Sequence, residues 1–171
     1  MSAVIFLRSV EFSSDVFGRI PVPGWLKPMF GGLCVGVIAL AFPQVLGVGY
    51  EATDLALKGQ YGLALLIALI AAKTAATAIC VGAGFGGGVF TPSMFIGAMV
   101  GGAFGLVATE FFPHLSSGHS AYTLVGLGAV SGAVLGAPIS TILIVFELTA
   151  NYALTIAVMM AVVIATVITQ Q

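Results

Sequence analysis

Charge is what this sequence lacks most. Only 6% of its 171 residues are Asp, Glu, Lys or Arg, whereas 60% are hydrophobic. About a quarter of the residues in an average soluble domain are charged, so this chain could not cover a surface that faces water. Two stretches, 74–109 and 111–146, contain no charged residue at all. Hydrocarbon is the solvent that permits such runs, and the composition therefore predicts a membrane protein.

Other scarce residue types exclude further classes of function. A net charge of −1 leaves no basic patch to neutralise phosphates, so nucleic acid is not an expected partner. The two cysteines, Cys34 and Cys80, each lie inside an apolar run and are predicted to be buried thiols rather than a disulfide or a metal site. His114 and His119 lie in a polar loop without a cysteine or carboxylate cluster, so no metal site is expected.

The order of apolar runs and breaks predicts an all-α, polytopic membrane chain. Residues 1–27 are amphipathic and are expected to form a polar, interfacial lead-in to membrane helices within 28–171. The predicted apolar segments are 28–42, 61–81, 89–112, 121–136, 138–149 and 152–169, with a charged loop at 44–60. Segment 138–149 would be ~18 Å long and could not cross a hydrocarbon layer of ~30 Å. Short helices interrupted by proline or glycine are typical of transporters.

Glycines also recur at a spacing of four residues along the apolar segments. The sets are Gly32/Gly36, Gly97/Gly101/Gly105 and Gly128/Gly132/Gly136. Small residues at this spacing let helix backbones approach closely in a bilayer, so we expect these glycines to lie at helix–helix contacts.

A glycine-rich turn separates two long apolar segments. Residues 82–88 contain five glycines, and Pro92 follows in the expected first turn of the next helix. The turn matches G-x-G-x-x-G formally, but a membrane helix rather than a strand precedes it, so a dinucleotide site is rejected. The first amides of a helix lack partners and attract anions. The residues alone leave two interpretations open, an anion site or a tight linker under other helices.

Residues 88–92, Gly-Val-Phe-Thr-Pro, fit the G-x-F-x-P signature of the CLC chloride channels and chloride/proton exchangers. Several further segments resemble the same family in the same order: 27–50, Gly126-Leu127-Gly128-Ala129, Gly136-Ala137-Pro138, 144–149 and Asn151-Tyr152. The resemblance covers nearly the whole chain and favours the anion interpretation of the turn.

The resemblance implies a fold, a site and partners. The fold would have broken and tilted helices, and the bound ion would be chloride, with no other cofactor. The amides of Val89 and Phe90 would contact the anion, with Gly88 permitting its approach and Pro92 fixing the helix start. The family also implies a homodimer in a lipid bilayer, with contacts from 138–149 and 152–169, and a multi-pass protein of the plasma (inner) membrane.

Departures from the family pattern are equally informative. The Gly-Ser-Gly-Ile-Pro segment and the Gly-Lys/Arg-Glu-Gly-Pro segment that carries the gating glutamate have no match in this sequence. The serine and tyrosine that complete the family's chloride site are also unmatched. The chain therefore resembles the second of two inverted repeats only, and by itself it is not expected to conduct. The choice between channel and exchanger rests on residues outside it.

Two other classes of function compete with anion transport. A non-transporting membrane assembly or scaffold would also use glycine-spaced helices. An intramembrane enzyme is disfavoured because Ser131 and Ser140 have no histidine within the apolar segments. The chain is therefore not expected to be an enzyme.

Three charged residues lie in or beside the apolar segments. Glu110 is expected at a membrane interface and Glu147 near water or paired, since neither matches a gating or proton-transfer glutamate of the family. Lys73 is expected to have a structural role, by extending to the interface or by pairing with a carboxylate.

Overall fold

The structure is a computed structural model that describes residues 2–19, 24–111 and 118–169. Within these ranges the chain forms α-helices and one 3-10 turn, with no strand, and the all-α prediction is confirmed. The elements are α1 (Ser2–Arg19), α2 (Lys27–Ala41), η1 (Pro43–Val45), α3 (Tyr50–Leu57), α4 (Leu63–Gly82), α5 (Phe90–Phe111), α6 (His119–Leu135), α7 (Pro138–Thr149) and α8 (Tyr152–Thr169).

Most predicted boundaries agree with the helices to within about two residues. The exceptions lie in the more polar parts of the chain. Residues 44–60 were expected to be a loop, but they contain the last part of η1 and the whole of α3. The lead-in contains the helix α1, whose Phe6 is fully buried. The end of the predicted segment 89–112 lies outside the described residues.

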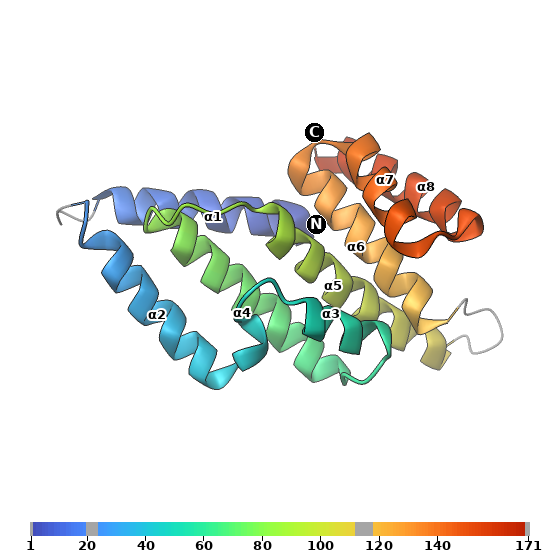
Figure 1. The fold of residues 1–171 in the computed structure, drawn as a ribbon, viewed down its shortest axis with the longest axis horizontal. Coiled ribbons are helices and arrows are strands. Elements are labelled where there is room, and N and C mark those ends of the chain that lie inside the picture. Colours follow the sequence, from blue (N-terminus) through green and yellow to red (C-terminus); the bar gives the residue numbers. More distant parts are fainter. Residues whose placement is uncertain (1, 20–23, 112–117, 170–171) are drawn as a thin grey trace.

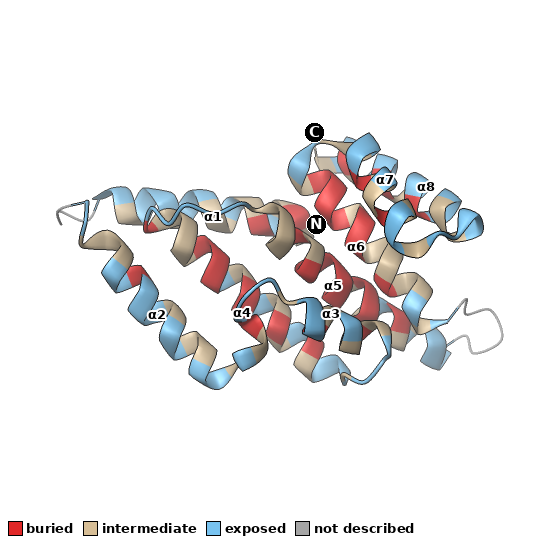
Figure 2. Cartoon of the chain, viewed as in Figure 1, coloured by how far each residue is buried: buried red, intermediate tan, exposed pale blue. Residues whose placement is uncertain are grey.

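The central layer consists of α4, α5 and α6, which run side by side (Figure 1). Helix α1 packs across α4 and reaches α6, whereas α2 flanks α4 at one end of the molecule and α7 and α8 pack on α6 at the other. Buried residues concentrate in the central helices (Figure 2). Among the described residues, α4, α5 and α8 are long and apolar enough to cross a membrane.

Glycines bring α5 and α6 into backbone contact, as their spacing predicts. A Cβ atom on Gly97 would lie 2.6 Å from the carbonyl oxygen of Gly126, and one on Gly101 would overlap the carbonyl oxygen of Tyr122. On the other side of α6, a Cβ on Gly132 would lie 2.7 Å from Val162 of α8. No larger residue fits at these positions without separating the helices.

The packing prediction was wrong for two glycines. Gly36 on α2 has no atom within 4 Å of the position that its Cβ would occupy. Gly136 has φ +62° and ends α6, where its N–H donates to the carbonyl of Gly132. Its role is to stop the helix rather than to pack it, because a residue in the left-handed region commonly follows the last turn.

Helix α7 has 12 residues, so the prediction of a segment too short to cross the membrane is confirmed. It begins at Pro138, where the missing N–H costs nothing, and ends at Thr149; the residue that caps it, Ala150, has φ +48°. The Ala150 N–H donates to the carbonyl of Phe146. Asn151 then starts α8 by accepting a hydrogen bond from the Leu154 N–H at 3.2 Å.

Candidate functional site

The glycine-rich turn first ends α4. The Phe85 N–H donates to Cys80 O at 3.0 Å, and the Gly84 N–H donates to Val81 O at 3.1 Å. This pair of hydrogen bonds is the Schellman arrangement, which needs a residue in the left-handed region. Gly84 supplies it with φ +85°. One glycine of the turn is therefore explained by the end of the preceding helix.

The three consecutive glycines of the turn, Gly86 to Gly88, are open on the side where a side chain would lie. A Cβ on Gly86 or Gly87 would have no atom within 4 Å, and one on Gly88 would meet only the backbone nitrogen of Phe90, at 4.0 Å. The backbone at Gly88 is therefore open to a ligand. A glycine in this position exposes the amides that follow it.

Helix α5 starts with amide donors that no carbonyl of the described chain accepts. Its first hydrogen bond runs from Ser93 N to Val89 O, at 3.0 Å. The N–H groups of Val89 and Phe90 precede this bond, and Pro92 has no N–H. The Ser93 hydroxyl donates to Phe90 O at 2.6 Å, which tightens the first turn. These amides lie at the positive end of the helix dipole.

Side-chain packing holds these amides in place. The side chain of Val89 is half-buried against a cluster made of Ala3, Phe6, Ile96, Val130 and Ala133, which come from α1, α5 and α6. The start of α5 is thereby attached to two other helices, α1 and α6. The side chain of Val89 packs in the core and its carbonyl accepts the Ser93 N–H, so its own N–H is the polar group that is left for a ligand.

A cavity of about 230 Å³ lies against the turn. Its lining residues come from α2, the η1–α3 connection, α4, the turn and α5: Val35, Val45, Leu46, Gly47, Lys73, Ala76, Thr77, Cys80, Val81, Phe85, Gly87, Gly88 and Pro92. Of the predicted site residues, Gly88 and Pro92 line this cavity. Val89 and Phe90 lie between them in the chain but are not lining residues. A water molecule in liquid occupies about 30 Å³, so an ion with water around it fits.

Lys73 is the charged residue of this cavity, and the sequence did not reveal its surroundings. Its side chain is 5% exposed. The ammonium donates to Val45 O at 2.8 Å and to Gly47 O at 2.9 Å, and it lies 5.1 Å from the ring centroid of Phe95. The structural role is confirmed, because Lys73 holds the connection after η1 against α4. Among the described residues the partners of Lys73 are carbonyl oxygens and not the expected carboxylate, whereas its expected extension to the interface stays a prediction.

The remaining candidates lie away from this cavity. Glu110 and Glu147 are exposed at or near the ends of α5 and α7. Ser131 is fully buried, and its hydroxyl donates to Leu127 O within its own helix at 2.6 Å. His119 Nε2 lies 2.9 Å from Ala56 O, which links α6 to α3, whereas His114 lies outside the described residues.

The cysteines differ from each other. Cys80 is half-buried and lines the cavity, whereas Cys34 is exposed on α2, so its predicted burial was wrong. Both are free thiols. The face of α2 that carries Cys34 is apolar and open, which a hydropathy pattern cannot distinguish from a buried face.

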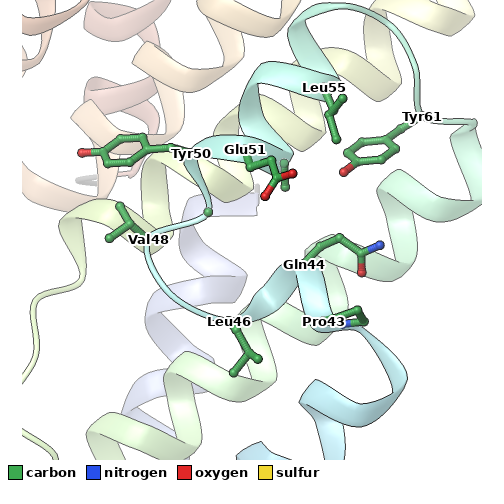
Figure 3. A pocket seen from close by; sticks show the side chains of 10 residues that line it. Pro43, Gln44, Leu46, Val48, Tyr50, Glu51, Leu55 and Tyr61 are labelled. Atoms are coloured by element: carbon green, nitrogen blue, oxygen red, sulfur yellow. The ribbon is translucent and has the colours of Figure 1, made fainter.

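A second, wider hollow of about 590 Å³ lies between the η1–α3 connection and the start of α4. Glu51 and Leu55 of α3 point toward Tyr61, and Gln44 lies below them (Figure 3). Burial, and to a smaller extent the charge of Glu51, raise the pKa of Tyr61 above its ordinary value. The phenol therefore stays neutral at physiological pH, and this hollow holds an acidic side chain rather than a positive one.

Comparison with known proteins identifies relatives over nearly the whole chain. A family model described as voltage gated chloride channel matches residues 1–170. The chain is 37% identical over 168 residues to the chloride channel protein CLC-f of Arabidopsis thaliana, covering 92% of this chain and 21% of that protein. It is 31% identical to the H(+)/Cl(-) exchange transporter ClcA of Yersinia pestis, covering 98% of this chain and 36% of the transporter.

The fold has a counterpart among solved structures. The crystal structure of a slow cyanobacterial Cl-/H+ antiporter superposes with a TM-score of 0.84 at 26% identity. The match covers 98% of this chain and 40% of the antiporter. The chain thus spans between about a fifth and two fifths of the length of these relatives.

Proposed function

Because this chain belongs to the voltage gated chloride channel family, we propose that it forms part of a membrane pathway for chloride, in a channel or a chloride/proton exchanger. The observation that carries the proposal is the start of α5. Its first amides, on Val89 and Phe90, have no carbonyl partner in the described chain and follow an open glycine beside a cavity. A desolvated anion is a ligand that accepts hydrogen bonds from such donors.

The proposed chemistry is binding and release rather than bond making. Chloride would lose part of its water shell and gain N–H donors from Val89 and Phe90, with Gly88 allowing the approach and Pro92 fixing the helix start. Amide dipoles stabilise the ion through partial charges at the start of the helix. No organic cofactor or metal enters this proposal, and chloride is the bound ion.

The transport test uses the intact gene product in liposomes loaded with chloride. We expect chloride efflux above that of empty liposomes when a potential drives it. Absence of flux from correctly folded, reconstituted protein would contradict the transport proposal and favour a scaffold.

The site test removes one donor. Phe90→Pro deletes the N–H group while keeping a residue that a first helical turn accepts. Phe90→Leu is the matched control, because it changes the side chain and keeps the amide. Isothermal titration should show chloride affinity at least about tenfold weaker for Phe90→Pro, and within about threefold of wild type for Phe90→Leu. Equal affinities of the two variants would remove Phe90 from the site.

The proposed assembly is a homodimer in the plasma (inner) membrane, with α7 and α8 contributing to the contact. Apolar side chains of both helices are exposed in the single chain, among them Ile139, Leu143, Met160 and Ile164. The mass of the protein in detergent, measured by light scattering, should correspond to two copies. A monomer at all concentrations would contradict this assembly.

A further inference from the structure

Lys73 carries a buried charge that no anionic side chain of the described residues balances. Among the described residues, the one ion pair joins Asp54 on α3 to Lys58, the residue that follows this helix. The described partners of Lys73 are neutral carbonyl oxygens. An ammonium has three donors, and two of them are used in this way. A buried cation is normally balanced by a nearby negative charge.

The charge of Lys73 lies at the same cavity as the glycine-rich turn. Lys73 on α4 and Gly87, Gly88 and Pro92 at the start of α5 line the same cavity of about 230 Å³. The other described lining residues are uncharged. The cavity therefore combines one fixed positive charge with the positive end of a helix dipole, and it offers no negative charge of its own.

We propose that Lys73 sets the affinity of an anion subsite inside this cavity, for a small monovalent anion such as chloride. This inference rests on the proposed function and adds to it a subsite, together with the side chain that determines its strength. The two hydrogen bonds of the Lys73 ammonium go to Val45 and Gly47, which also line the cavity, so its charge is fixed beside them. The anion supplies the counter-charge that the described protein lacks.

The first experiment measures chloride binding by isothermal titration to the intact gene product and to Lys73 variants. Lys73→Arg keeps the charge and should keep the affinity within about threefold. Lys73→Gln keeps donors but removes the charge and should weaken chloride at least about tenfold. Lys58→Gln is the matched control, because it removes a lysine charge from an exposed pair and should leave the affinity unchanged.

The second experiment needs no substitution, so it remains decisive if the Lys73 variants fail to fold. Cys80 lines the cavity and Cys34 is exposed on α2, so one molecule holds both a reporter and a control thiol. Methyl methanethiosulfonate is attacked by the thiolate, forms a methyl disulfide and releases methanesulfinate. Chloride, compared with gluconate at equal ionic strength, should slow the modification of Cys80 at least about threefold and leave that of Cys34 unchanged. Mass spectrometry of the peptides gives both rates.

The outcomes separate the two proposals. Wild-type protein that binds no chloride would overturn the proposed function. Wild-type protein that binds chloride, with Lys73→Gln binding equally well or with Cys80 modified at the same rate in chloride and gluconate, would overturn the subsite while leaving the amides of α5 as the anion site. Weaker binding in Lys73→Gln together with protection of Cys80 supports the subsite.

Discussion

Two glycine-rich regions of this chain use the same residue type for opposite purposes. Where α5 crosses α6, Gly97 and Gly101 are pressed against the backbone of the neighbouring helix. In the turn between α4 and α5, Gly86 and Gly87 have nothing within 4 Å of their Cβ positions. In the first region the lack of a side chain lets two helix backbones touch. In the second region it leaves the backbone of the turn exposed. In α5 the packed glycines are four residues apart, whereas in the turn the open glycines are consecutive.

One methyl group added where α5 meets α6 should have the largest effect on stability. Gly101→Ala places a Cβ over the Tyr122 carbonyl oxygen and 3.0 Å from the Cα of Gly126. These are backbone atoms that cannot rotate away, so we expect the free energy of unfolding to fall by at least about 2 kcal/mol. Gly36→Ala, in open space on α2, should change it by less than about 1 kcal/mol. Unfolding followed by circular dichroism in detergent measures both, and equal effects would contradict the assignment.

Within the turn, Gly84 differs from its neighbours because conformation requires it. Gly84→Ala forces an L-residue to φ +85° and should cost about 1–2 kcal/mol of stability. Gly86→Ala meets no atom and has no left-handed φ, so it should cost less than about 0.5 kcal/mol. The same unfolding measurement compares them. A Gly86→Ala protein as unstable as Gly84→Ala would show that the turn is packed rather than open.

Gly88 is expected to affect binding rather than folding. Its Cβ would lie 4.0 Å from the Phe90 nitrogen, so the branches of a valine there would cover the amide donor. Gly88→Val should weaken chloride at least about tenfold in isothermal titration, with the unfolding temperature within a few degrees of wild type. Unchanged chloride affinity would mean that the anion does not reach this amide.

One residue other than glycine adopts the left-handed conformation among the described residues, and replacing it should change stability only slightly. Ala150 has φ +48° between α7 and α8. Ala150→Gly should stabilise the protein by about 0.5–1 kcal/mol, because relief of the left-handed strain exceeds the entropy gained by the unfolded chain. Ala157→Gly, inside α8, should instead destabilise it by about 1 kcal/mol. Differential scanning calorimetry should show transition temperatures that move in opposite directions.

Hydropathy and glycine placement made much of the fold predictable. The apolar runs predicted α2 and α4 to α8, because a membrane helix requires a long apolar segment and proline or glycine marks its ends. They did not reveal α3, whose eight residues include two acidic ones and which buries only the small side chains of Ala52 and Ala56. Such a helix owes its stability to its neighbours rather than to its own pattern.

One part of the candidate site, the start of α5, was also predictable from the sequence. Glycines and Pro92 mark the start of α5, so the amide donors follow from local sequence. The partners of Lys73 do not, because its hydrogen bonds go to carbonyl oxygens 26 and 28 residues earlier in the chain. Every residue has a carbonyl oxygen, so no residue type signals which one a lysine will reach. A lysine within an apolar helix was the one available sign.

The hydrogen bond between His119 and Ala56 has a consequence for the order of assembly. It joins residues 63 positions apart, across the whole of α4 and α5. Gly49, just before α3, also packs against Phe95 of α5. An isolated helix of eight residues is not stable, so we expect α3 to depend on α5 and α6 for its final position. We therefore expect α3 to become fully protected from proteases only when the chain extends through α6.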